Sequence, residues 1–485
     1  MNKSNLSPSC VFDQFKQINQ IPRPSKHEER MVEYLKEFAK KHGLDVKVDA
    51  VNNVIIRKPA TPGYENRKVV ILQSHTDMVC DKLVDVEFDF NTDAIQTYID
   101  GDWMKAKGTT LGADDGIGVA MQLAVLESND IEHGPLECVF TSDEETQMTG
   151  ASGMEPGFMT GDWLINLDSE DEGEIFVSCA GGRSTHAVFH FEKEEAPKDY
   201  FFLQISVKGL TGGHSGDDIN KKRANAIKLL TRFVYLEQEK YDVRLASFNS
   251  GKLHNAIPRD GRVVMAVPND VKENVRADWN VFAHEVADEF HVTDTAMEFA
   301  MESANAEKVM PVDVSRRIIM ALQGITNGVF AICQDPALGG MVETSSNIAV
   351  VKTTDNMVDL LASQRSNVMS NLTNQCNAVG AVLKLAGAEV EQTDGYPAWQ
   401  MNPNSELTKV AIESYKRLFN KEPIVRGIHA GLECGQFATS YPGMDMVSFG
   451  PTLRDVHTPD ERLLIPTVQM VWDHLLDILK NVPAK

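Results

Sequence analysis

Val69-Val70-Ile71-Leu72-Gln73-Ser74-His75-Thr76-Asp77 is the stretch that decides the fold of this chain. Its first five residues are mostly apolar or β-branched, which predicts a strand buried on both faces of a sheet. Side chains alternate along a strand, so His75 and Asp77 point the same way. Open α/β sheets bind their ligands at the edge where such strands end. His75 is therefore a candidate metal ligand, with Asp77 either holding its ring or acting one shell further out, and a satisfied surface pair is the alternative.

Acidic side chains follow further apolar runs in the first part of the chain. The runs 136–141 and 164–167 each predict a buried strand, and a glycine-rich turn precedes a helix expected over 119–127. Taken singly, each motif fits a solvated loop or a capped helix start. Their recurrence at one strand end after another is the stronger signal and favours a common site. The residues concerned are Asp114, Asp115, Glu144, Glu145 and Asp168.

The overall charge excludes one class of partner. The 485 residues include 47 Lys and Arg against 70 Asp and Glu, so the formal net charge is −23. Such a surface repels phosphate backbones, and nucleic acid is not expected as a partner. The 42% hydrophobic and 24% charged content is typical of a soluble globular protein, and the length predicts two or three domains.

Targeting and redox signals are absent from the sequence. No run of about 18 apolar residues predicts a membrane span, and no apolar core follows the first residues. The seven cysteines are scattered without a Cys-x-x-Cys pair, which argues against a disulfide scaffold or a thiolate metal site. We expect a reduced, cytoplasmic protein without a membrane partner.

A change in residue pattern along the chain predicts an inserted domain. A small-residue stretch near 178–182 is suited to a hinge, and strands then alternate with long amphipathic helices. We expect an α/β catalytic domain formed by residues 1–184 and 396–485, with a separate α/β domain at 185–395. The helices expected in the insert span 221–240, 270–290, 312–323 and 369–387. Those expected outside it begin at the capping-box pattern of Ser25 to Glu28 and cover 404–419 and 465–479.

The candidate ligands define a type of chemistry. Two imidazoles and three carboxylates suit zinc, with cobalt or manganese as alternatives. Five ligands are too many for one tetrahedral catalytic ion, and they fit two ions if one carboxylate bridges. Two such ions can share a hydroxide and polarise a carbonyl, and Glu144 is then a spare carboxylate that can serve as general base. The five candidates are His75, Asp114, Glu145, Asp168 and His457.

The order of these motifs resembles the co-catalytic zinc exopeptidases related to carboxypeptidase G, and within them the dipeptidase branch. The resemblance runs from about residue 10 to the end of the chain. One departure is Gly116, which stands where many relatives carry a basic residue. The motifs that carry the resemblance are Ser74-His75-Thr76-Asp77-Met78-Val79, Thr110 to Gly118, Ser142-Asp143-Glu144-Glu145, His429 to Gly435 and His457-Thr458-Pro459.

This resemblance implies a role for each candidate residue. One ion would be held by His75, Asp114 and Asp168, and the other by Asp114, Glu145 and His457, so that Asp114 bridges. Asp77 would support His75, and Glu144 would be the general base. The insert would be a lid and dimerisation domain, so a homodimer is expected. The residues implied in substrate binding are His214, Asn255, Arg365, His429 and Gly450.

The implied reaction is hydrolysis of unblocked dipeptides, including those that end in histidine. The free amine would meet carboxylates near the ions, and lid residues would hold the substrate's carboxylate. Two alternatives remain open: an aminoacylase or deacetylase on the same scaffold, and a non-catalytic peptide-binding protein. A spare carboxylate at Glu144 argues against the second, because a purely structural site needs no base.

Overall fold

The strand predicted before His75 forms the centre of a mixed sheet. The computed structural model describes residues 6–338 and 340–485. In it, β3 (Val70–His75) is buried along its whole length. It pairs in parallel with β6 (Leu136–Thr141) on one side and β7 (Trp163–Asn166) on the other. Burial between two strands and on both faces explains why these runs are apolar throughout rather than alternating.

The rest of this sheet adds antiparallel margins to the parallel centre. Its order is β1–β2–β6–β3–β7–β23–β8–β22. β23 joins β7 in parallel, whereas the pairs β1–β2, β2–β6 and β23–β8 are antiparallel. The strands not yet located are β1 (Asp45–Val48), β2 (Val54–Lys58), β8 (Glu174–Cys179), β22 (Ile424–Ile428) and β23 (Asp445–Ser448).

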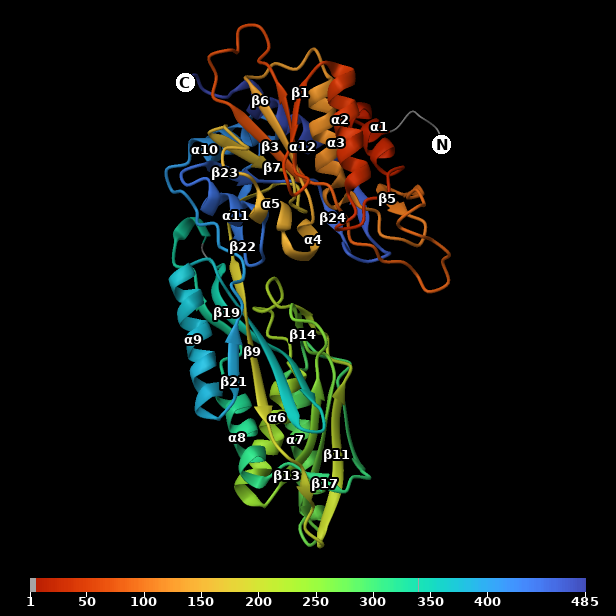
Figure 1. Cartoon of the computed structure of the whole chain (residues 1–485), viewed down its shortest axis with the longest axis vertical. Coiled ribbons are helices and arrows are strands. Elements are labelled where there is room, and N and C mark those ends of the chain that lie inside the picture. The colour runs from red at the N-terminus through yellow and green to blue at the C-terminus, as the bar shows by residue number, and fades with distance from the viewer. Residues whose placement is uncertain (1–5, 339) are drawn as a thin grey trace. The chain divides into compact units, whose positions relative to one another are not determined.

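Helices cover this sheet in two groups. α3 (Ala113–Glu127) lies on β3 and packs against α1 (Ser9–Ile18), and α2 (Glu29–His42) packs beside them on β1 and β2 (Figure 1). α10 (Glu406–Phe419) packs on α12 (Ile465–Lys480) and β23. The short helices α4 (Glu144–Gln147), α5 (Thr149–Gly153) and α11 (Glu433–Ser440) complete this part of the chain.

The start of α2 differs from the expected capping box. The helix begins at Glu29, and no side chain caps it. Ser25 donates its hydroxyl to Asp77 Oδ2 instead, at 2.7 Å. Glu28 Oε1 accepts from the backbone of Lys26 and of Asp143. The Ser-x-x-Glu residues therefore tie the helix start to neighbouring loops, and the prediction of reciprocal capping was wrong.

A small sheet lies beside the main one and carries the last candidate ligand. Its order is β24–β25–β5–β4. Two of its strands come from the end of the chain, and the segment 455–461, which contains His457, connects these two. The strands are β4 (Thr97–Asp100), β5 (Trp103–Ala106), β24 (Leu453–Arg454) and β25 (Arg462–Leu464).

The middle of the chain forms a second sheet, antiparallel in its pairings. Its order is β16–β11–β15–β13–β19–β20–β9–β21, and β18 pairs with β19. The strands are β9 (Gly181–His190), β11 (Tyr200–Lys208), β13 (Arg244–Ser250), β15 (Gly261–Pro268), β16 (Glu298–Ser303), β18 (Gly328–Ile332), β19 (Val342–Thr353), β20 (Met357–Ser366) and β21 (Glu389–Gln392). Short ladders join β10 (Glu194–Glu195) to β17 (Lys308–Val309) and β12 (Gly213–His214) to β14 (Ala256–Ile257).

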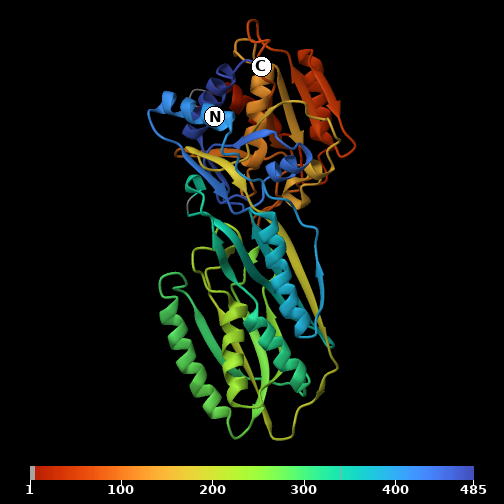
Figure 2. The ribbon, with the colours of Figure 1, turned by 90° about the vertical axis from the view of Figure 1, so that its left-hand side faces the viewer.

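Four long helices cover one face of this second sheet (Figure 2). Apolar side chains from the helices and the sheet form one continuous core. The helices are α6 (Ala226–Lys240), α7 (Lys272–Glu289), α8 (Val312–Gly324) and α9 (Met369–Leu385), each inside or close to its predicted range. A short 3-10 helix covers Pro336–Leu338.

Contacts along the chain divide it into two units. Unit 1 consists of Met1–Ser178, Trp399–Gly427 and Leu432–Lys485, and unit 2 consists of Cys179–Ala398 and Ile428–Gly431. Unit 1 contains the parallel strands, and unit 2 contains the antiparallel sheet. Across residues 6–338 and 340–485, none of the helices has both the length and the apolar content needed to cross a membrane.

Candidate metal centre

The candidate ligands lie at one edge of the unit 1 sheet. β3, β6 and β7 are parallel neighbours, so their carboxyl ends meet at that edge. His75 is the last residue of β3, and Asp168 follows β7 by two residues. Glu144 and Glu145 open α4 just after β6, and Asp114 lies in a non-helical turn at the start of α3. Sequence reasoning from strand ends therefore placed these side chains at the correct edge.

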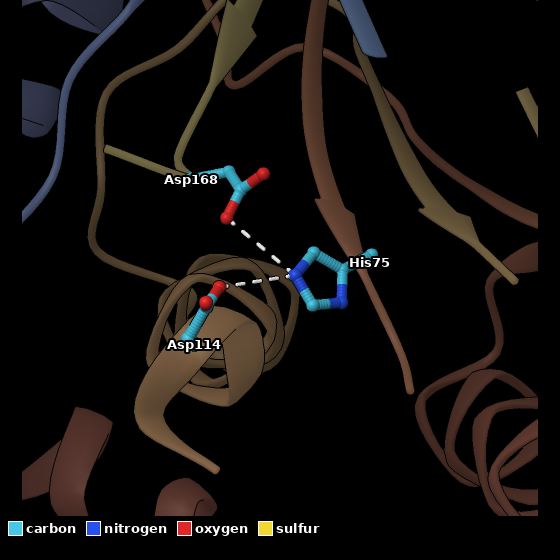
Figure 3. Close-up of side chains that lie close together, drawn as sticks. All are labelled: His75, Asp114 and Asp168. Carbon is cyan, nitrogen blue, oxygen red and sulfur yellow. Dashed lines mark hydrogen bonds and ion pairs between the residues drawn. The ribbon is translucent and has the colours of Figure 1, made fainter. Parts of the chain in front are cut away.

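Asp114 stands between two imidazoles. Its Oδ1 lies 3.1 Å from His75 Nε2, which is also 3.5 Å from Asp168 Oδ1 (Figure 3). Its Oδ2 lies 3.1 Å from His457 Nε2, which is also 3.0 Å from Glu145 Oε2. Each oxygen of one carboxylate thus faces a different histidine, and each histidine faces a second carboxylate. The arrangement is two three-residue groups that share Asp114.

The electrostatics of this cluster call for cations. Burial raises the pKa of Asp168 and of Glu145, and neighbouring carboxylates raise both further, although the histidines oppose the rise. Burial alone would lower the pKa of His75, but Asp168, Asp114 and Asp77 raise it well above its usual value. Within the described residues, no lysine or arginine forms an ion pair with Asp114, Glu145 or Asp168. Negative charge gathered without a lysine or arginine partner is what divalent ions can compensate.

The donor set fits borderline divalent ions. Each of the two groups offers one imidazole nitrogen and two carboxylate oxygens, which are ligands that zinc, cobalt and manganese accept. Glu145 Oε1 is buried and has no hydrogen-bond partner in the part of the chain that the structure describes. A buried acceptor without a donor is costly unless a cation occupies the space beside it. The cluster can therefore hold two ions, with Asp114 common to both.

Asp77 supports two parts of the centre at once. Its Oδ1 lies 3.3 Å from His75 Nδ1, the ring nitrogen that faces away from Asp114. Its two oxygens also accept from the backbone N–H groups of Glu144 and Glu145, at 3.0 and 3.2 Å. A carboxylate on the far nitrogen fixes the tautomer and orientation of a metal-binding histidine. Asp77 thus lies against both His75 and the acidic turn.

Glu144 stands outside the two groups that share Asp114. Its carboxylate lies within 4.8 Å of ligand atoms of His75 and Glu145. Burial raises its pKa well above the usual value, and nearby Glu145, Glu433 and Asp114 add to the rise, against the opposing effect of His75. A carboxyl group with a raised pKa is suited to exchanging protons near neutral pH.

A belt of polar side chains lies one layer below the ligands, and the sequence analysis missed it. Gln73 donates to Glu433 Oε2 and accepts from Asn166, both at 2.6 Å. Thr141 donates to the same Glu433 oxygen at 2.7 Å, and Ser448 donates to Asn166. These bonds cross β6, β3, β7 and β23 beneath the strand ends. The available signal was Gln73 itself, a polar residue inside an otherwise apolar strand.

Three of the residues implied in substrate binding lie together in unit 2. His214 Nε2 is 3.3 Å from Arg365 Nη2, and Arg365 Nη1 donates to the hydroxyl of Tyr396 at 2.6 Å. His429 is bound to Ser345 Oγ at 2.7 Å, and its pKa is lowered to about 3 by burial first and by Arg365 second. A Cβ atom placed on Gly216 would touch both His429 and His214. The cluster combines a guanidinium with imidazoles, a composition suited to a carboxylate ligand.

The other two implied residues occupy different surroundings. The backbone carbonyl of Asn255 accepts from Ser215, next to His214 in the same unit. Gly450 lies in unit 1, where a Cβ atom would stand 1.9 Å from the carbonyl oxygen of Ser169. The structure thus shows Gly450 allowing close packing of the segment that follows Asp168, and its part in substrate binding stays a prediction.

Comparison with known proteins identifies the family. The profile of peptidase family M20/M25/M40 matches residues 71–481. The chain is 44% identical over 483 residues to the cytosol non-specific dipeptidase of Escherichia coli strain K12, and the alignment covers 99% of each chain. It matches the crystal structure of aminoacylhistidine dipeptidase from Vibrio alginolyticus with a TM-score of 0.89 and 42% identity, over 100% of this chain and 99% of that one.

A more distant structure shares the fold alone. A tripeptidase from Staphylococcus aureus matches with a TM-score of 0.57 and 18% identity, over 98% of this chain and 99% of that chain. These findings confirm the resemblance to the exopeptidases and the expected α/β class. The chain belongs to peptidase family M20/M25/M40.

Proposed function

We propose that this protein is a metal-dependent dipeptidase that hydrolyses unblocked dipeptides, including those that end in histidine. The observation that carries the proposal is Asp114, whose two oxygens face His75 and His457 within one acidic cluster. The names of two relatives above 40% identity, a non-specific dipeptidase and an aminoacylhistidine dipeptidase, support it. We assign zinc to the two ion sites, with cobalt and manganese as alternatives.

The protein's own residues would divide the work as follows. When bound, two such ions polarise the scissile carbonyl and activate water. Glu144 takes the proton of the attacking water on its carboxylate and passes it to the leaving amine. Asp77 keeps the His75 ring and the Glu144 turn in place. The cluster's remaining negative charge suits the free amino group of a dipeptide.

Unit 2 would supply the groups that recognise the substrate's carboxylate, as a lid. Arg365 carries a guanidinium that can bind a carboxylate in a bidentate manner. His214, 3.3 Å from it, would stabilise the oxyanion that forms during hydrolysis. His429, with a pKa lowered to about 3 by burial first and by Arg365 next, would contribute a hydrogen bond rather than a charge. We assign Asn255 and Gly450 to the same substrate contacts.

Metal removal and a substrate panel test the proposal together. A chelator should reduce cleavage of Gly-Gly and of β-alanyl-histidine by at least about a hundred-fold, because the cluster loses the ions that polarise the carbonyl. Zinc, cobalt or manganese should restore it. Tripeptides, N-acetylated dipeptides and C-amidated dipeptides should be cleaved poorly, since each is longer than a dipeptide or lacks a free amino or carboxylate group.

Each other outcome of this panel has a clear meaning. Preferred cleavage of N-acyl amino acids would establish the aminoacylase alternative. Tight peptide binding without turnover in the metal-loaded protein would establish the binding-protein alternative. Full activity on C-amidated dipeptides would contradict the role given to Arg365.

A homodimer is part of the proposal, and an edge strand of unit 2 supports it. β18 pairs with β19, and its Val329, Phe330 and Ile332 are 37%, 56% and 39% exposed. An exposed apolar edge strand is ready to pair with another chain. Light scattering should give twice the chain mass, and Phe330→Glu should shift the protein towards the monomer. An unchanged dimer in that variant would place the interface elsewhere.

The expected location is the cytoplasm. The relative from Escherichia coli is named for the cytosol, which supports this location.

A further inference from the structure

The turn that carries Asp114 is held by a carboxylate from the far end of the chain. Glu461 Oε2 accepts from the backbone N–H groups of Leu111 and Gly112, at 2.7 and 3.0 Å. Its Oε1 accepts from those of Ala113 and Asp114, at 2.8 and 3.4 Å. Glu461 is only 2% exposed. One buried side chain therefore satisfies four consecutive amides, which the start of a helix leaves without partners.

A buried arginine holds the same turn from its carbonyl side. Arg23 Nη2 donates to the carbonyl of Gly112 at 2.5 Å, and its Nη1 donates to the carbonyls of Thr76 and Asp77, at 3.1 and 2.8 Å. Gly112 has φ +67°, and a Cβ there would meet Arg23 Nη2 at 2.6 Å. A Cβ on Gly116 would meet the same nitrogen at 2.6 Å. Both glycines thus leave room for the guanidinium.

Glu461 belongs to the loop that carries His457. This loop, 455–461, joins β24 to β25, and an ion pair between Asp455 and Arg462 closes its base at 3.0 Å. Glu461 N–H donates to the carbonyl of Thr458, which folds the loop back on itself. His457 is 49% exposed at its side chain, so packing alone does not fix it. The attachment of Glu461 to the turn 111–114 therefore links the His457 loop directly to the residue that His457 faces.

We propose that Glu461 is a positioning residue that fixes His457 relative to Asp114 and thereby sets the affinity of the ion site formed by Asp114, Glu145 and His457. This inference rests on the proposed function, because it assigns a role within the same two-ion centre. His75 and Asp168 follow β3 and β7, whose pairing does not depend on Glu461. The affinity for the ion beside His75 and Asp168 should therefore change less when Glu461 is substituted.

Metal titration of Glu461→Gln tests this role without relying on activity. Glutamine has one acceptor oxygen, and its NH2 group would face the amide donors, so at least one side of the clamp is lost. Removing such an outer partner typically weakens metal binding by about 10- to 100-fold. Cobalt binding can be measured by visible absorption. We expect the affinity for one of two bound cobalt ions to fall by that factor, and the affinity for the other to fall by less than about threefold. Asp460→Asn removes an exposed carboxylate from the adjacent position and should change neither.

Double variants identify which ion is affected. In a His457→Ala background, Glu461→Gln should cause no further loss of ion affinity, because both substitutions act on one site. In an Asp168→Ala background, Glu461→Gln should cause the same loss of ion affinity as in the wild-type protein. Equal binding of both ions in Glu461→Gln, or additivity with His457→Ala, would overturn the inference. If Glu461→Gln does not fold, Glu461→Asp, which withdraws the carboxylate by one methylene, should show a smaller loss at the same ion. A wild-type protein that binds fewer than two ions would instead overturn the proposed function.

Discussion

Asp114→Ala is expected to leave the protein unable to hold either ion tightly. Its two oxygens face His75 and His457, so one substitution removes a ligand from both groups. Loss of both ions removes the activated water and the electrostatic stabilisation of the carbonyl, and each contributes about 10²-fold or more to such reactions. We therefore expect kcat to fall by about 10³-fold or more. Metal analysis after dialysis, together with dipeptide turnover, measures both effects.

Two further variants separate the charge of Asp114 from its packing. Asp114→Asn keeps the shape of the side chain and removes the charge, so it should lose metal to a similar degree. Asp102→Ala removes an exposed aspartate from a turn of the same unit and should retain two ions and full turnover. Two tightly bound ions in Asp114→Ala would show that the residue does not bridge.

Glu144→Gln should produce the opposite combination, in which turnover is lost and metal is kept. Glu144 lies outside the two groups that share Asp114, and its carboxyl group is the candidate proton carrier. General acid–base catalysis contributes about 10²- to 10⁴-fold, so we expect kcat to fall by that factor, or roughly 3–5 kcal/mol in the activation barrier. Metal content should stay near two ions per chain, and the Michaelis constant should change little.

The neighbouring glutamate provides a matched comparison. Glu145→Gln alters the same kind of side chain in the same turn, but Glu145 Oε2 faces His457 in one of the ion sites. This variant should therefore lose one ion as well as activity. If Glu144→Gln keeps more than about a third of wild-type turnover, Glu144 is not the general base.

The sequence was most informative where local pattern and topology coincide. Apolar runs predicted β3, β6 and β7, and the geometry of parallel strands then predicted that His75, Glu145 and Asp168 would meet. His457 has no such local signal, because its position depends on a small separate sheet. It was included among the five candidates by its residue type, and the resemblance to a known family assigned it to the second ion.

Residues that serve the backbone escaped sequence reasoning for a physical reason. Glu461 and Arg23 satisfy amides and carbonyls, and such partners leave no pattern in the identities of the residues that they contact. The Ser25 motif failed for the related reason that Asp77 competes for its hydroxyl. A local motif predicts which partners a side chain can bind, and the fold determines which of those partners lies within reach.

The split of unit 1 along the chain has a consequence for biosynthesis. His75, Asp114, Glu145 and Asp168 are all synthesised before unit 2, whereas His457 follows after it. Chains generally begin to fold from the amino-terminal end as they emerge from the ribosome. A nascent or prematurely terminated polypeptide would thus lack one imidazole, and on the proposed ligand assignment hydrolytic competence would arise only once translation has passed the inserted unit.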